Sequence, residues 1–137
     1  MMPDGLPLSL PLIRNCLEGI VPSVLATADP AGMPNVSMIS HVQYVDPEHV
    51  ALSYQFFNKT RRNLLATRLA SVAVVDPDTD AQYRLAIEYV ETQTSGPLYE
   101  VMKAKLAGIA SHAGMQSVFR LLGSDVFRVR SIEVMPS

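Results

Sequence analysis

Residues 53–63 carry the side chains of this chain that are best suited to bind an anion. If Asn58 caps a helix there, the first helical turn contains Lys59, Thr60, Arg61 and Arg62. A helix N-terminus presents unpaired N–H groups and a partial positive charge, which basic and hydroxyl side chains reinforce. These residues therefore predict a phosphate-binding site. A capped helix with a solvated basic face is the alternative, and the spacing alone leaves both open.

Three other features contain residue types that occur at functional sites. His41 lies within a predicted strand, where we favour a structural role over contact with a ligand, because neighbouring strand residues point to opposite faces. Asp76, Asp78 and Asp80 alternate like calcium ligands, but the Gly and distant Glu of an EF-hand loop are missing. We expect a solvated turn and no metal site. Cys16 is the only cysteine, which excludes an intrachain disulfide and fits an apolar helix position.

The composition predicts one globular domain over residues 1–137, with a helical segment within residues 1–20. Hydrophobic residues make up 48% of the chain and charged residues 18%, which argues against extended disorder. The formal net charge of −2 gives no reason to expect nucleic-acid binding. No apolar run approaches the length of a membrane span, so we expect no membrane association and a cytoplasmic location.

Short apolar segments separated by turn residues predict a mainly β protein of the α+β class. Their close spacing favours antiparallel hairpins over parallel crossovers. Strands are expected at residues 22–28, 35–45, 49–55, 71–75, 83–90 and 126–134, and helices at residues 9–17, 59–68 and 98–112. This order predicts a six-stranded antiparallel barrel with peripheral helices.

The apolar spacing in two of these helices predicts which side chains face the core. In and just after the helix at residues 59–68 they are Leu64, Leu65 and Leu69. In the helix at residues 98–112 they are Leu98, Val101, Met102, Leu106 and Ile109.

Several segments, taken in order, carry a family resemblance. They are Asn-Val-Ser-Met-Ile-Ser-His-Val at residues 35–42, Tyr-Val-Asp at 44–46, His-Val-Ala-Leu-Ser at 49–53 and Gln-Phe-Phe-Asn-Lys-Thr-Arg-Arg-Asn-Leu at 55–64. Residues 94–100 and 123–129 agree with them. Together they resemble the pyridoxamine 5′-phosphate oxidase-like family, and within it a branch of small bacterial flavin-nucleotide-binding proteins. The resemblance implies a split β-barrel that binds FMN and forms a homodimer with the flavin near the interface.

The resemblance also implies which residues hold the flavin ring. In relatives, the second strand lies along the isoalloxazine and bonds its polar edge through backbone groups. The corresponding residues of this chain are Ser37, Met38, Ile39 and Ser40.

The phosphate of the flavin has its own counterparts in this chain. Relatives place a hydroxyl near the ribityl phosphate at the end of the third strand, which corresponds to Ser53. Their phosphate-binding basic pair aligns with Asn58 and Lys59, of which Lys59 matches and Asn58 replaces a frequent Arg. Thr60 would add a hydroxyl, and Arg61 or its neighbour Arg62 would restore the missing charge.

The sequence departs from the family where the oxidases hold their substrate. Ser37 stands where they carry a basic residue at the start of the second strand, and their Arg-rich C-terminal segment finds no match here. We therefore expect an FMN-dependent oxidoreductase or reductase acting on an unidentified small molecule, rather than the oxidase reaction itself. The alternatives are a non-catalytic flavin-binding or sensory module, or a barrel that binds deazaflavin or haem. Haem would take His41 as its axial ligand.

Overall fold

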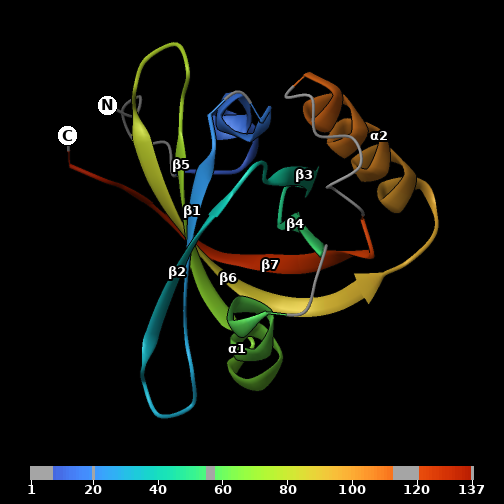
Figure 1. Ribbon diagram of the computed structural model, residues 1–137. Helices are drawn as coiled ribbons and strands as arrows, with labels where there is room; N and C mark the ends of the chain where they lie inside the picture. The colour runs from blue at the N-terminus through green and yellow to red at the C-terminus, as the bar shows by residue number, and fades with distance from the viewer. Residues whose placement is uncertain (1–7, 20, 55–57, 113–120, 137) are drawn as a thin grey trace.

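The computed structural model describes residues 8–19, 21–54, 58–112 and 121–136. Within them, seven antiparallel strands form one sheet in the order β2-β1-β5-β6-β7-β4-β3 (Figure 1). The strands are β1 (Ser23–Ala28), β2 (Pro34–Ile39), β3 (Gln43–Asp46), β4 (His49–Tyr54), β5 (Leu69–Val75), β6 (Gln82–Gln93) and β7 (Gly123–Val134). The helices are the 3₁₀ helix η1 (Pro11–Leu17) and the α-helices α1 (Lys59–Thr67) and α2 (Pro97–His112).

The mainly β, α+β class is confirmed, with the difference that the described sheet has seven strands instead of the predicted six and is not closed into a barrel. The expected strand at residues 35–45 is two strands, β2 and β3, separated at residues 40–42. β2 pairs with β1, whereas β3 pairs with β4 on the other side of the sheet. At the break, His41 Nε2 lies 3.0 Å from the Leu17 carbonyl oxygen of η1, and Val42 is buried. β2 and β3 are the two edges of the sheet, which stays open.

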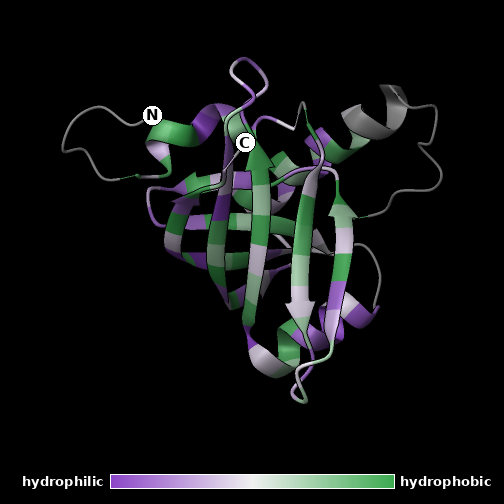
Figure 2. Ribbon diagram, turned by 90° about the vertical axis from the view of Figure 1, so that its left-hand side faces the viewer, coloured by the Kyte–Doolittle hydropathy of each residue, from purple (hydrophilic) through white to green (hydrophobic). Residues whose placement is uncertain are grey.

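The main core contains buried apolar residues of β1, β4, β5, β6 and β7, and apolar and polar residues follow one another along several strands in Figure 2. Leu85 and Ile87 of β6 are fully buried, as expected for two residues on the same face of a strand. Phe127 of β7 packs edge-on against Tyr89, with ring centroids 5.8 Å apart. The helix η1 adds Ile13 to this core, so the predicted helix at residues 9–17 is confirmed in place, although it is a 3₁₀ helix.

The predicted basic helix is confirmed as α1, and its caps explain its limits. The Asn58 side chain accepts a hydrogen bond from the Arg61 N–H, and Arg68 ends the helix in a left-handed conformation with φ of 65°. Leu64 is buried as predicted. Leu65 and Leu69 are 43% and 45% exposed, so their predicted inward direction is wrong. The side of α1 that faces the sheet carries polar residues, which hydrophobic periodicity does not detect.

The helix α2 packs beside the ends of β4 and β7 (Figure 1). Met102 and Leu106 are buried there against Val126, as predicted. Val101 is 46% exposed, which contradicts its predicted inward direction, and the side chain of Ile109 lies outside the described residues. None of the helices in the described part of the chain has the length and apolar character needed to cross a membrane.

Candidate functional site

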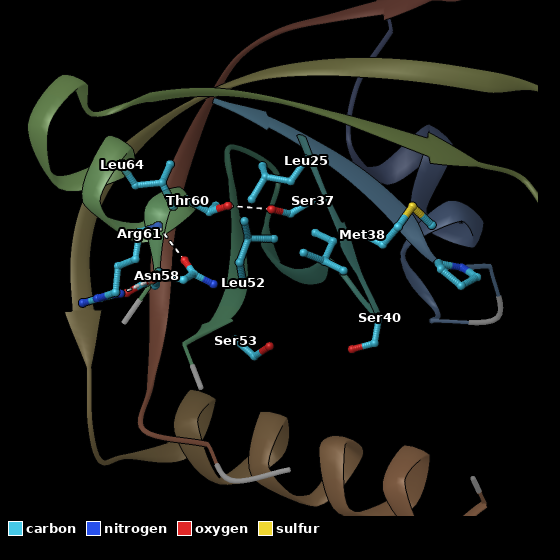
Figure 3. A pocket seen from close by; sticks show the side chains of 13 residues that line it. Leu25, Ser37, Met38, Ser40, Leu52, Ser53, Asn58, Thr60, Arg61 and Leu64 are labelled. Carbon is cyan, nitrogen blue, oxygen red and sulfur yellow. Dashed lines mark hydrogen bonds and ion pairs between the residues drawn. The ribbon is translucent and has the colours of Figure 1, made fainter. Parts of the chain in front are cut away.

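A pocket of about 440 Å³ opens where the β1–β2 hairpin, the end of β4 and the start of α1 meet (Figure 3). Apolar side chains form most of its wall, and polar groups concentrate near α1 and at the ends of the strands. The described lining residues are Pro22, Leu25, Ser37, Met38, Ile39, Ser40, Leu52, Ser53, Asn58, Thr60, Arg61, Leu64 and Asp125. An apolar wall with a few convergent polar groups is typical of a small-molecule site, and the volume falls in the usual range of about 300–1,000 Å³.

The first turn of α1 supplies hydrogen-bond donors at one end of this pocket. The Asn58 side chain accepts from the Arg61 N–H at 3.0 Å, and the first intrahelical bond runs from the Arg62 N–H to the Asn58 carbonyl. The N–H groups of Lys59 and Thr60 precede that bond and have no acceptor within the helix. With the helix dipole, they favour a negatively charged ligand group at this end.

Three polar side chains join the start of α1 to the sheet edge. The hydroxyls of Ser37 and Thr60 lie 2.5 Å apart, and Asn35 Nδ2 donates to Thr60 Oγ1 at 2.7 Å. The two hydroxyls carry two hydrogens, of which their mutual bond uses one. Since Asn35 is a donor in this arrangement, the pair has one further O–H to give. Ser37 and Thr60 both line the pocket, so a ligand oxygen there can accept it.

A second contact fixes α1 against the strand next to β2. Asn63 Nδ2 donates to Thr27 Oγ1 at 3.1 Å, and both residues are buried. Asn63 and Thr60 are three residues apart, so they lie on the same side of α1. That side therefore faces the β1–β2 hairpin through hydrogen bonds, which sets the direction of the helix N-terminus relative to the pocket.

The side chain of Arg61 takes part in a buried polar network at the edge of the pocket. Arg61 Nη1 donates to Asp125 Oδ2 at 2.5 Å, and the two side chains are only 12% and 6% exposed. Thr92 Oγ1 donates to the other carboxylate oxygen at 2.6 Å and lies 2.5 Å from the Tyr89 hydroxyl. Because Thr92 donates to Asp125, it accepts from Tyr89. The carboxylate thus ends a chain of hydrogen bonds and also neutralises a guanidinium.

At the other end of the pocket, two hydroxyls face each other. Ser40 follows β2 and Ser53 lies near the end of β4, and their side chains point toward one another in Figure 3. They come from strands at opposite parts of the sheet order, so the curvature of the sheet brings them to one site.

Eight of the nine residues predicted to bind a cofactor line this one pocket; their binding role stays a prediction. Seven of them are Ser37, Met38, Ile39, Ser40, Ser53, Asn58 and Thr60. The eighth, Arg61, lines the pocket too, but its charge is paired with Asp125. Lys59 is exposed at the first position of α1 and is not among the described lining residues.

Two residues with reactive side chains lie away from the pocket. His41 Nε2 faces a carbonyl oxygen, so it carries the ring proton. Burial holds the pKa of His41 below its ordinary value of 6.5, although the bond to Leu17 acts in the opposite direction. This geometry agrees with the structural role favoured from the sequence. Burial, followed by the nearby Asp76 charge, raises the pKa of Cys16 to about 11, so its thiol stays protonated in the core.

A family model for pyridoxamine 5′-phosphate oxidase matches residues 10–132, which is most of the chain. The chain belongs to this family. A comparison with curated proteins found no match.

Solved structures of known proteins share the fold of this member of the pyridoxamine 5′-phosphate oxidase family. An FMN-binding protein from Syntrophomonas wolfei subsp. wolfei has a TM-score of 0.73 at 20% identity, covering 92% of this chain and 90% of that one. An F420 reductase has a TM-score of 0.62 at 16% identity, covering 96% and 98%. The haem storage protein HutZ from Vibrio cholerae has a TM-score of 0.55 at 22% identity, covering 90% and 92%. Identities this low show the fold alone.

In this member of the pyridoxamine 5′-phosphate oxidase family, sequence reasoning missed one polar residue of the pocket, Asp125, and two residues that hold α1 beside it, Asn35 and Thr27. Asp125 lies two residues before the core residue Phe127 on β7, so strand alternation places its carboxylate on the inner face. A charged residue on the inner face of a strand indicates a polar site inside the protein, and this signal could have identified Asp125. Asn35 and Thr27 gave no such signal, because polar residues near strand ends are common and their partners are on α1.

Proposed function

We propose that the pocket binds FMN and that the protein is an FMN-dependent oxidoreductase or reductase acting on an unidentified small molecule. One observation carries the proposal: the N-terminus of α1 and the Ser37–Thr60 hydroxyl pair face an apolar pocket that runs along the edge strand β2. This arrangement has separate places for a phosphate and for a flat, largely apolar ring. The family membership supports the same cofactor.

The groups near α1 fit a phosphate. The N–H groups of Lys59 and Thr60 have no acceptor within the helix, and the hydroxyl pair has one O–H left to donate. A phosphate has three acceptor oxygens that can take these hydrogens. Lys59 is exposed at the same turn, where its flexible side chain can approach the phosphate from the solvent.

The opposite part of the pocket fits the flavin ring. β2 is an edge of the described sheet, and an edge strand presents backbone N–H and C=O groups along its free side. Those groups match the alternating donors and acceptors on the polar edge of an isoalloxazine. Leu25, Leu52 and Ile39 contribute apolar wall for the rest of the ring.

Bound FMN would supply the electron-transfer and hydride-transfer chemistry, and the chain's residues would bind and orient it. The start of α1 would fix the phosphate end, and β2 would fix the ring. Ser40 and Ser53, which face each other at the end of the pocket away from the start of α1, would hold polar groups of the flavin there.

We propose further that a second copy of the chain covers the outer face of the β1–β2 hairpin. Val24, Val36 and Met38 are 37%, 66% and 68% exposed. Val24 of β1 lies directly opposite Met38 of β2, and Val36 precedes Met38 by two residues on β2. The three side chains therefore form one apolar strip. Met38 also lines the pocket, which would place the flavin near the interface of a homodimer. Such strips on soluble proteins mark interaction sites.

The other ligands have less support from the site. One structural neighbour is a haem storage protein, but the described lining of this pocket contains no His, and His41 is bonded to Leu17. A deazaflavin has a ring of the same shape as the isoalloxazine of FMN. The similarity to an F420 reductase makes it the main alternative cofactor. A non-catalytic flavin-binding or sensory module would use the same pocket.

The visible absorption spectrum of the purified protein tests the proposal. We expect a flavin spectrum that FMN restores after its removal, and bleaching of that spectrum when a nicotinamide donor is added without oxygen. A Soret band instead of flavin bands would point to haem. Flavin bands that no nicotinamide donor bleaches would favour the non-catalytic module. Binding of a deazaflavin with no binding of FMN would replace the cofactor in the proposal.

A further inference from the structure

The ion pair of Arg61 and Asp125 decides how much positive charge the pocket presents to a ligand. Among the described residues that line it, Arg61 carries the one positive charge and Asp125 the one negative charge. They are in contact at 2.5 Å and almost fully buried. The negative charge of Asp125 therefore offsets part of the attraction that the Arg61 guanidinium exerts on a third group nearby. The side chain of Arg61 also extends away from the other labelled pocket side chains in Figure 3.

The position of the pair makes this offset matter for a phosphate. Arg61 is the third residue of α1, and one turn of helix rises about 5.4 Å. A phosphate on the N–H groups of Lys59 and Thr60 would therefore occupy the same pocket as the pair, and salt screens buried charges much less than exposed ones. A fixed carboxylate there repels the phosphate and offsets part of the attraction of the guanidinium.

On the basis of the FMN site proposed above, we infer that Asp125 is a specificity-determining residue. Its carboxylate neutralises Arg61 and so lowers the preference of the pocket for FMN over riboflavin, which has the same ring and ribityl chain without the phosphate. The pocket consequently accepts isoalloxazines with and without a phosphate. The residual preference for FMN comes from the helix N-terminus, the hydroxyl pair and Lys59.

The hydrogen bonds of Asp125 explain why its carboxylate holds this position. Thr92 and Arg61 each donate to a different carboxylate oxygen, and Tyr89 in turn donates to Thr92. An amide in place of the carboxylate keeps the shape and one acceptor, but it leaves the guanidinium charge uncompensated inside the protein. Phosphate can compensate that charge, whereas riboflavin cannot.

The test compares dissociation constants of FMN and riboflavin for the wild type and Asp125→Asn. We expect the ratio of the riboflavin constant to the FMN constant to rise at least about fivefold in the variant, since one repulsive charge near the phosphate is removed. FMN binding should also become more sensitive to salt. An unchanged or smaller ratio in a folded variant overturns the inference.

Glu88→Gln is the matched control, because it removes the same charge from a surface pair with Arg128 that does not line the pocket. The ratio of the two dissociation constants should stay at the wild-type value in this variant.

If Asp125→Asn does not fold, Arg61→Gln tests the same inference in the opposite direction. This variant keeps the carboxylate near the phosphate but removes the guanidinium, so the ratio of the riboflavin constant to the FMN constant should fall. A ratio that does not fall then overturns it. Failure of the wild type to bind either flavin would contradict the proposed function itself.

Discussion

The Thr60 hydroxyl at the start of α1 lies 2.5 Å from the Ser37 hydroxyl on β2, and it also accepts a hydrogen bond from Asn35. One contact thus connects the helix that would hold a phosphate with the strand that would hold a flavin ring. The geometry of the pocket depends on this connection together with the hydrogen bond from Asn63 to Thr27, which also attaches α1 to the hairpin.

Replacing Thr60 by Val removes this connection while keeping the side-chain shape. We expect the free energy of unfolding to fall by about 1–3 kcal/mol, because the Asn35 amide loses its acceptor in a half-buried position. FMN should bind more weakly, because the hydroxyl that joins the start of α1 to β2 beside the pocket is lost. Urea denaturation and FMN titration measure the two effects. Thr94→Val, at an exposed position after β6, is the control, and equal behaviour of both variants would contradict the role of Thr60.

Lys59→Ala tests whether this exposed side chain contacts the phosphate. We expect FMN affinity to fall about two- to fivefold, as is usual for an exposed charge near a helix terminus, and riboflavin affinity to stay the same. Fluorescence titrations with both ligands measure the difference. Lys103→Ala on the exposed side of α2 controls for net charge. Equal losses for FMN and riboflavin would show that Lys59 does not hold the phosphate.

Val36→Lys tests the proposed homodimer. Val36 is 66% exposed on the outer face of β2, so the change should leave the fold intact. A buried Lys at an interface is unfavourable, and we expect the dimer dissociation constant to rise at least about tenfold, which corresponds to ~1.4 kcal/mol. Analytical ultracentrifugation measures it, with Thr79→Lys in the exposed β5–β6 turn as control. A wild type that stays monomeric at high concentration would refute this part of the proposal.

His41 predicts a dependence of stability on pH. Burial lowers its folded-state pKa below 6.5, so the unfolded chain binds more protons in the window beneath 6.5. The free energy of unfolding should therefore decrease as the pH falls through that window. His41→Gln keeps a donor for the Leu17 carbonyl but does not titrate, and its stability should decrease less. Identical pH profiles in denaturation experiments would rule out His41 as a source of this dependence.

Much of the fold follows from local sequence signals. The Asn58 cap, the β6 alternation and the turns predict α1 and most strands close to their observed limits. The break between β2 and β3 was missed, because residues 35–45 have no Gly or Pro inside the run to signal it. What separates the two strands is tertiary: they pair with different partners, and His41 turns to a carbonyl of η1.

The candidate site follows from the sequence only in part. The resemblance to the family selected eight residues that line one pocket, but the ninth, Lys59, is not among the described lining residues. The resemblance implies that Arg61 or Arg62 restores the charge that Asn58 lacks, whereas the structure pairs Arg61 with Asp125, which is 64 positions away. Leu65 was predicted inward because apolar residues normally mark the buried side of a helix, but here polar contacts from Thr60 and Asn63 decide which side faces the sheet.

Titration of the flavin-free protein with FMN, compared between two tryptophan variants, tests the location of the cofactor most directly. Ser40→Trp places a large ring in the pocket, whereas Gln82→Trp places it at the exposed start of β6, away from the pocket. We predict saturable FMN binding by the wild type and by Gln82→Trp, and a loss of at least about tenfold in affinity for Ser40→Trp. Wild-type protein that does not bind FMN, or a folded Ser40→Trp variant that binds it as tightly as the wild type, would contradict the account.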